Sequence, residues 1–338
     1  MILASFTFMK YDIITIGGAT KDIAFLTAEG VLIDNHRDVL RQKLLAFEYG
    51  AKITIDHFHN LFGGGAANAA VNFAASGFKV ACLARIGIDD SGRAIVDNLN
   101  RQGVAIELLS QDRSAATGLS FILVAKGGER IIFTSRGAND NFKISESDRK
   151  ILAGAKWLYF ASLSGDWLKN INYIFAQSGP KIAWNPGLSQ CQAGLKKLAP
   201  FLKKTDVFCI NKDEAIELVL SDSRYHGQSP DFLNSVKNLL LALKEKVSGI
   251  VLITDGQYGA DVYDGKRFYH QAVLKEKKRV DITGVGDVFN SSFVAGLEIT
   301  KGDIKKSLYL GAKNTASKIA YFGAQNGLLD LRKIKKFN

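Results

Sequence analysis

The 338-residue sequence has few prolines, few cysteines and no long apolar run, and each shortage excludes a class of protein. With only four prolines, no proline-rich linker separates domains. Three isolated cysteines, Cys82, Cys191 and Cys209, lack the spacing of a zinc site or a disulfide scaffold and are typical of the reducing cytoplasm. No apolar run is long enough to cross a bilayer, so we expect a cytoplasmic protein with no membrane partner.

The formal net charge is +11, which by itself is compatible with nucleic acid, a membrane surface or a phosphorylated small molecule. The charge is spread widely, with modest clusters at residues 275–279 and 332–336. Because no zinc-finger spacing or aromatic RNA-binding signature accompanies it, we expect a solvated basic surface and no nucleic-acid partner. Binding to DNA with a steep salt dependence would favour the alternative.

What is present is a hydrophobic content of 47%, enough for a sizeable core in one large α/β domain or two smaller ones. Residues 1–8 are apolar but lack the basic segment and cleavage site of a signal peptide. The stretch from Met9 to Asp12 resembles the first residues of a cytosolic protein more closely than Met1 and the residues after it do. We therefore expect residues 1–10 to be an N-terminal extension of a single domain over residues 11–331.

The order of the expected elements indicates the fold class. Residues 12–16 form a buried strand, and from residue 145 onward helices and strands alternate along the chain. Such alternation predicts an α/β fold with three layers, in which helices cover both faces of a mostly parallel sheet. Two segments, about 23–62 and 117–136, are rich in strands with no helix between them, and we expect them to pair as one small separate sheet.

The most informative stretch lies near the C-terminus. Residues 279–282 are predicted to end a strand, Gly284 and Gly286 permit a tight turn with exposed amides, and a helix follows from Asp287. Amides and a helix N-terminus favour an anion, and the carboxylate of Asp287 is placed to accept a proton from an attacking hydroxyl. This pairing indicates phosphoryl transfer. An acidic helix cap after a glycine turn explains the same residues equally well.

Earlier segments offer matching substrate contacts. Asp22 follows the first strand and Gly17-Gly18, at the edge where ligands bind in open α/β sheets, although a solvated turn aspartate is the simpler interpretation. Three glycines from Gly63 precede a helix of small residues, so the backbone can approach a ligand closely. Asn68, one turn into that helix, offers both a donor and an acceptor to a hydroxyl. Close packing of the helix on the sheet is the alternative.

Two further constellations lie in the second half. Asn211 and Glu214 are three residues apart at the start of a helix, where they would hold a hydrated Mg²⁺ through its waters or form a capping box. Thr254, Gly256 and Gly259 follow an apolar strand. Their spacing suits a turn whose backbone packs closely against a nucleotide, and a simple hairpin turn is the alternative. Because no Gly-x4-Gly-Lys-Ser/Thr loop occurs, a P-loop phosphotransferase is not expected.

Together, the order and spacing of these motifs resemble the ribokinase-like (PfkB) carbohydrate kinase family over residues 11–331. The glycine block matches residues 63–68, and the Asp-Thr-x-Gly-Ala-Gly-Asp signature of the family matches residues 281–287. The Asn-x-x-Glu element matches Asn211 and Glu214, and the Thr-x-Gly-x-x-Gly turn matches residues 254–259.

The resemblance implies a role for each matched residue. Asp287 is similar to the catalytic base, and the amides of Gly284, Val285 and Gly286 are similar to the anion hole. The residues that resemble the family's contacts to substrate hydroxyls are Asp22, Gly63, Gly64 and Asn68. ATP contacts are implied for Asn211, Thr254, Gly256, Gly259 and Asn314. Glu214 would organise Mg²⁺ through water, and Asp281 and Thr283 fall where some members bind a monovalent cation such as K⁺. The small sheet resembles the lid of the family, which in some members forms a homodimer.

The sequence also departs from ribokinase itself. Ile282 replaces the usual threonine, and Thr20 stands where ribokinases carry asparagine. The segment between Asp22 and Gly63 is longer than in ribokinase. We therefore expect an ATP-dependent kinase of a sugar, with an adenosine-type nucleoside kinase or a catalytically silent nucleotide or sugar sensor as the alternatives.

Overall fold

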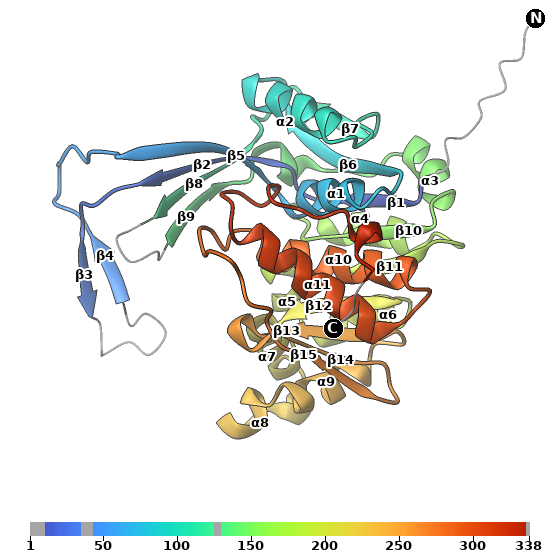
Figure 1. The fold of residues 1–338 in the computed structure, drawn as a ribbon. Helices are drawn as coiled ribbons and strands as arrows, with labels where there is room; N and C mark the ends of the chain where they lie inside the picture. Colours follow the sequence, from blue (N-terminus) through green and yellow to red (C-terminus); the bar gives the residue numbers. More distant parts are fainter. Residues whose placement is uncertain (1–10, 35–42, 125–129, 336–338) are drawn as a thin grey trace, which may run out of the picture.

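The structure is a computed structural model that describes residues 11–34, 43–124 and 130–335. The expected N-terminal extension, residues 1–10, lies outside this range. Figure 1 shows a compact body from which a long, twisted sheet projects to one side. Within the described ranges, no helix combines the length and the apolar character that a membrane span requires.

The body is built on a sheet with the strand order β15-β14-β13-β12-β11-β10-β1-β6-β7. Neighbours from β13 through β7 pair in parallel, and β14 pairs antiparallel with both β13 and β15. The strand bounds are Ile13–Ile16 (β1), Val80–Gly87 (β6), Leu109–Asp112 (β7), Trp157–Phe160 (β10), Lys181–Trp184 (β11), Val207–Asn211 (β12), Ile250–Thr254 (β13), Ala260–Tyr263 (β14) and Phe268–Gln271 (β15).

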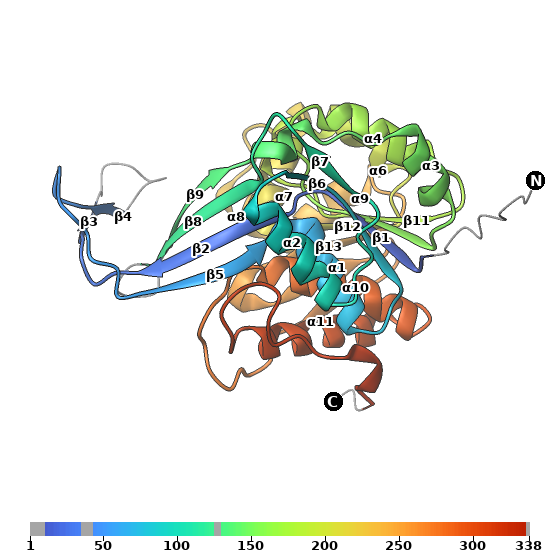
Figure 2. The same ribbon diagram turned by 90° about the horizontal axis from the view of Figure 1, so that it is seen from above.

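Helices cover both faces of this sheet, because each central strand buries alternate side chains in opposite directions. In β12, for example, Phe208 packs into one hydrophobic cluster and Cys209 into the other. Figure 2 separates the two helical layers. One layer contains α3 (Glu146–Ala153), α4 (Trp167–Phe175), α5 (Leu188–Gln192), α6 (Leu195–Leu202), α7 (Lys212–Leu220) and α9 (Val236–Lys244). The other contains α1 (Gly65–Ala75), α2 (Asp90–Arg101), α10 (Val285–Ile299) and α11 (Ile304–Lys318). The short α8 (Pro230–Asn234) precedes α9.

The projecting sheet has the order β5-β2-β8-β9 and is called the lid below. Its strands are β2 (Thr20–Leu26), β5 (His57–Gly63), β8 (Gly118–Val124) and β9 (Arg130–Ser135). A separate hairpin of β3 (Val31–Asp34) and β4 (Lys43–Ala46) lies beyond its tip. The predicted three-layer fold with a small separate sheet is thus confirmed.

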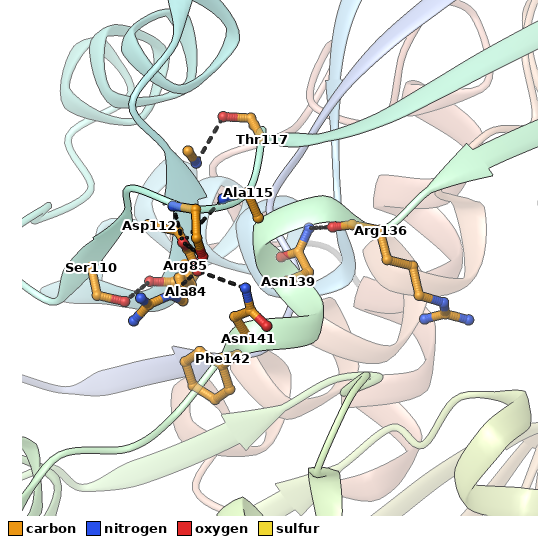
Figure 3. Close-up of polar contacts among 12 residues, drawn as sticks. Ala84, Arg85, Ser110, Asp112, Ala115, Thr117, Arg136, Asn139, Asn141 and Phe142 are labelled. Atoms are coloured by element: carbon orange, nitrogen blue, oxygen red, sulfur yellow. Dashed lines mark hydrogen bonds and ion pairs between the residues drawn. The ribbon is translucent and has the colours of Figure 1, made fainter.

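A buried carboxylate fixes the point where the lid leaves the body (Figure 3). Asp112, at the end of β7, is 2% exposed and accepts hydrogen bonds from Ser114, Ala115, Arg85 and Asn141. These bonds, led by that from the Ser114 hydroxyl, hold the pKa of Asp112 well below its ordinary value. The loop that enters β8 is therefore anchored to the body just before the lid begins.

One predicted element is absent. Residues 279–282 form a loop rather than a strand, because both Val280 and Asp281 donate their amides to the single carbonyl of Ile319 at the end of α11. β-branched residues there match strand propensity, but in the described part of the chain no strand pairs with them.

Candidate active site

The predicted site residues gather at the edge of the body where the parallel strands end. β1, β10, β11, β12 and β13 all point their carboxyl ends to this edge, which is where open α/β sheets bind ligands. The lid strands β2 and β5 begin and end beside it, so the site lies between body and lid.

The glycine block joins lid strand β5 to helix α1. Gly64 is the N-cap of α1 with φ +88°, and a methyl group added there would lie 2.4 Å from the carbonyl oxygen of Gly18. That carbonyl accepts the amides of Ala66 and Ala67, so the turn after β1 and the start of α1 are held together. Glycine is required here by the positive φ and by the close approach of two backbones.

The signature stretch forms the N-terminus of α10. Gly284 is its N-cap in the left-handed region, with φ +71°, and no side chain caps the helix among the described residues. The first-turn amides of a helix have no intrahelical acceptor. Asp287 occupies the first turn, and a Cβ added to Gly286 would meet nothing within 4 Å, so the face beside the amides is open. Such an end favours an anionic group.

A chain of amide side chains orients the Asp287 carboxylate. Asn68 donates its Nδ2 to Asp287 Oδ2 at 2.8 Å and accepts at Oδ1 from Gln325 Nε2 at 3.0 Å. Gln325 in turn accepts from Asn98 Nδ2 at 2.7 Å. Asn68, predicted to bind a substrate hydroxyl, is 4% exposed, and its side chain contacts this carboxylate. Burial raises the pKa of Asp287, an effect that the Asn68 hydrogen bond reduces and the Asp22 charge increases.

Asp22 does not lie in a turn, as the sequence suggests, but within lid strand β2. Its register places it between Leu61 of β5 and Ser120 of β8, and it is 6% exposed. Burial raises the pKa of its carboxyl group, and hydrogen bonds from Thr20 and Ser120 offset part of that rise. The first strand of the lid therefore places a second carboxylate close enough to Asp287 for the two charges to interact.

Asn211 and Glu214 form a complete capping box on α7. Asn211 Oδ1 accepts from the Glu214 amide at 2.8 Å, and Glu214 Oε2 accepts from the Asn211 amide at 3.2 Å. Both also line the same cavity as Asp287. Burial, with a smaller contribution from the charge of Asp287, raises the pKa of Glu214 to about 7. The capping role and a ligand-binding role are therefore compatible in this position.

Two cavities meet at Asn211, Thr254 and Gly286. The smaller, of about 270 Å³, contains Asp287 and Glu214 and is called the acceptor cavity. The larger, of about 400 Å³, is called the nucleotide cavity and is lined mostly by apolar groups of α10, α11 and the loop after β15. A still larger, more open depression of about 710 Å³ lies at the amino ends of β10 and β11, and it contains none of the predicted site residues.

The nucleotide cavity includes most, but not all, of the predicted ATP contacts. Thr254, Gly256 and Gly259 line it, and the φ of +98° at Gly259 lets the chain turn against the carbonyl of Gln271. Asn314 does not line it. It is fully buried, donates to Asn72 and Ser292, and accepts from the Leu329 amide, so it joins α1, α10 and the C-terminal segment. Its neighbours Thr315 and Ala316 face the cavity instead.

Asp281, one of the two residues expected to hold a monovalent cation, already faces a charge of the protein itself. The ammonium of Lys318 donates to the main-chain oxygen of Asp281 at 2.7 Å and lies 3.8 Å from its Oδ2. A free cation on the same oxygens would lie beside this charge. Two unit charges about 4 Å apart repel by roughly 4 kcal/mol at an effective dielectric constant of about 20.

Several residues of the site have no clear signal in the sequence. Asn185, at the end of β11, and Asn290, in α10, line the acceptor cavity, and the Asn290 Oδ1 is buried without a hydrogen-bond partner in the described chain. Arg279 lines the nucleotide cavity. Asn185 directly follows a buried strand, as Asn211 ends one, and this position is the one signal that would have identified it.

A second unpredicted feature is the segment 322–325, which contacts the site residues and the lid. Phe322 stacks on His59 of the lid with ring centroids 4.2 Å apart, and Gly323 donates its amide to Asp281. A methyl group on Gly284 would lie 2.3 Å from the Cβ of Ala324. This segment therefore touches the lid, the α10 turn and the Asn68–Asp287 pair.

Comparison with known proteins agrees with this geometry. The family model described as pfkB family carbohydrate kinase matches residues 33–331. Ribokinase from Mus musculus is 29% identical over 234 residues, which cover 68% of each chain.

Solved structures share the fold. Arabidopsis thaliana ribokinase complexed with ribose and ATP superposes with a TM-score of 0.76 at 18% identity, covering 96% of this chain and 97% of that one. Burkholderia thailandensis nucleoside kinase in complex with inosine gives a TM-score of 0.72 at 17% identity, with 95% of both chains covered.

Proposed function

The chain belongs to the pfkB family of carbohydrate kinases and is a phosphotransferase, and from this we propose that it transfers the γ-phosphoryl group of ATP to a hydroxyl group of a sugar. Asp287 is the general base of the proposed reaction. Family membership also supports ATP as the phosphoryl donor.

The observation that carries the proposal is the arrangement around Gly286. The acceptor and nucleotide cavities share this residue, and Asp287 follows it in the first turn of α10. A γ-phosphoryl group entering from the nucleotide cavity therefore meets the helix N-terminus and a carboxylate together. Asn68 holds that carboxylate by one oxygen, which leaves the other, Oδ1, to accept the proton of the attacking hydroxyl.

The remaining residues position the two reactants. The amides of Gly284, Val285 and Gly286 stabilise the charge on the transferring group. Asp22 and the backbone of Gly63 and Gly64 bind the hydroxyls of the acceptor. The nucleotide lies along Asn211, Thr254, Gly256 and Gly259. Closure of the lid excludes water that would otherwise accept the phosphoryl group.

Magnesium is part of the proposal, and the residues present fit it. Glu214 and Asn211 offer oxygen ligands beside Asp287, where neighbouring carboxylates leave an excess of negative charge. In the described ranges no three His, Cys, Asp or Glu side chains gather as a protein-only metal site. Mg²⁺ is commonly held by one carboxylate, water and the phosphates of the substrate. When bound, it balances phosphate charge.

The proposal is tested by Mg²⁺-dependent ADP release against a panel of pentoses, hexoses, sugar acids and nucleosides. Asp287→Asn tests the base, and Asp97→Asn, on the exposed side of α2, is the matched control. We expect one strong acceptor, loss of turnover in Asp287→Asn and none in the control. Turnover that survives Asp287→Asn would refute the assignment of the base. ATP binding without any turnover would instead indicate a nucleotide or sugar sensor.

A nucleoside is the second candidate acceptor. One feature favours it: the stacked His59 and Phe322 rings lie at the contact between lid and body and offer aromatic surface to a base. The inner side of the lid near Asp22, with Thr20 and Ser120, is polar and favours a sugar. The nucleosides in the panel decide between the two.

We also propose that the lid forms a homodimer. Four large apolar side chains, Phe58, Phe121, Ile131 and Phe133, share the outer face of the lid by strand register and are 64%, 42%, 37% and 56% exposed. Such a continuous apolar face is typical of an interaction surface. Phe133→Glu is expected to give a monomer in sedimentation equilibrium, while the exposed Leu241→Glu on α9 is not. A wild-type monomer would contradict this proposal.

The expected cytoplasmic location also remains a proposal and rests on three unpaired buried cysteines.

A further inference from the structure

A buried lysine contacts the turn that leads into α10. Lys318, the last residue of α11, is fully buried. Its Nζ donates to the main-chain oxygen of Asp281 at 2.7 Å and lies 3.8 Å from the Oδ2 of the same residue. Burial of an ammonium group is unfavourable unless hydrogen bonds and an opposite charge compensate it. Asp281 supplies both, so the position of this charge is defined by the fold.

The Asp281 carboxylate joins two segments of the site. Its Oδ1 accepts from the Thr283 amide at 2.8 Å and its Oδ2 accepts from the Gly323 amide at 2.7 Å. The first bond shapes the turn before Gly284, and the second ties that turn to the segment 322–325. Burial acts to raise the pKa of Asp281, but the charge of Lys318 and these hydrogen bonds together outweigh it, so this pKa lies below its ordinary value. The carboxylate therefore stays ionised across the neutral range.

We propose that the Lys318 ammonium is the built-in cation of this turn and that the protein needs no K⁺ or other free monovalent cation. The oxygens of Asp281 that would bind such an ion already accept or face the ammonium. Lys318 acts as a positioning residue, because it fixes the turn that presents the amides of Gly284, Val285 and Gly286. The kinetic part of this inference rests on the proposed kinase function, but the binding part does not.

The first test uses the wild-type protein without substrate. Its melting temperature is measured in potassium, ammonium, sodium and tetramethylammonium chloride at equal ionic strength. We expect the same value in all four salts. A specific rise in potassium that saturates with concentration would overturn the proposal, whatever the substrate proves to be.

The second test removes the built-in charge. Lys318→Ala leaves a cavity beside Asp281, and we expect its melting temperature to rise in ammonium or potassium but not in tetramethylammonium, which is too large for the cavity. Its turnover in tetramethylammonium should fall by roughly tenfold, the effect of one lost charge-assisted hydrogen bond, and recover in ammonium. Lys313→Ala, an exposed lysine on the same helix, is the control and should show neither effect.

The outcomes separate this inference from the kinase proposal. A Lys318→Ala protein with wild-type stability and no response to small cations would overturn the role of Lys318, even if kinase activity is established. If Lys318→Ala does not fold, Lys318→Met keeps the length of the side chain without its charge, and the same salt series is applied to it. Potassium activation of the wild-type enzyme would overturn the inference and leave the kinase proposal intact.

Discussion

Replacing Gly63 by alanine provides a sharp test of the acceptor side of the site. Gly63 lies at the end of β5, paired with Thr20 of β2, and its φ is outside the left-handed range, so the backbone tolerates alanine. The added Cβ would lie 2.1 Å from Asp22 Oδ2 and 2.7 Å from both Asp22 Cγ and Thr20 Oγ1. Because strand pairing holds the backbone, the carboxylate is the group that moves.

The size of the effect follows from this overlap. Ordinary contact begins at 3.4 Å, so the difference from 2.1 Å requires Asp22 Oδ2 to move by about 1.3 Å. A misplacement of about 1 Å is known to cost roughly 100-fold in rate. We therefore expect kcat/KM for the acceptor to fall by about 100-fold, equivalent to about 2.7 kcal/mol at about 1.36 kcal/mol for each factor of ten.

The assay is ADP release at saturating ATP over a range of acceptor concentrations, with ATP affinity measured separately by calorimetry. ATP affinity should be unchanged, because Gly63 does not line the nucleotide cavity. Gly154→Ala is the matched control, since its φ is also unrestrictive and its new Cβ would meet nothing closer than 3.5 Å. In an Asp22→Ala background the overlap with the carboxylate is gone and only the 2.7 Å approach to Thr20 Oγ1 remains, so Gly63→Ala should add much less than it does in wild type. A kcat/KM close to wild type would refute contact between Asp22 and the acceptor.

Three further changes test other parts of the site. Asp287→Asn should lower kcat by roughly 10²- to 10⁴-fold, as expected for loss of a general base. Burial raises the pKa of Asp287 in the folded state, so its ionisation costs stability as the pH rises from the ordinary value of 3.8 to the raised one. The variant should therefore be more stable than wild type at pH 8, and the difference should vanish as the pH falls to that ordinary value. Gln325→Ala should lower kcat by about tenfold at unchanged ATP affinity, the effect of one lost hydrogen bond in the chain that orients Asp287. The exposed Asn100→Ala on α2 should not lower kcat, and equal effects of the two changes would contradict that role. Asp112→Ala should lower the melting temperature more than Asp97→Ala does. It should also raise the KM of the acceptor, because it removes the hydrogen bonds that hold the base of the lid. An unchanged KM would show that this anchor does not position the lid.

Much of the fold was predictable because its signals are local. Alternating helix and strand patterns from residue 145 onward predict the parallel sheet, and the hairpin at residues 118–135 predicts part of the lid. The resemblance to PfkB kinases, based on short motifs in a fixed order, is confirmed by the family match over residues 33–331. Local preference failed at residues 279–282, where β-branched residues found no strand to pair with.

Short stretches of sequence were sufficient to predict where backbone turns expose amides. Gly64 and Gly284 adopt positive φ, and both begin a helix at the carboxyl edge of the sheet. These features depend on a few neighbouring residues, because only glycine adopts such angles without strain. The same is true of the Asn211–Glu214 capping box, whose partners are three residues apart.

Which side chains meet follows from the packing of segments that are distant in the chain. Asn68 and Asp287 are 219 residues apart, and no pattern in the sequence predicts the hydrogen bond between them. Asn314 is buried between helices instead of facing the nucleotide cavity, and Lys318 brings its charge to Asp281. Each of these contacts depends on how α1, α10 and α11 pack together. Helix periodicity predicts that a residue faces the core, but the neighbour it finds there is set by packing between segments that are distant in the chain.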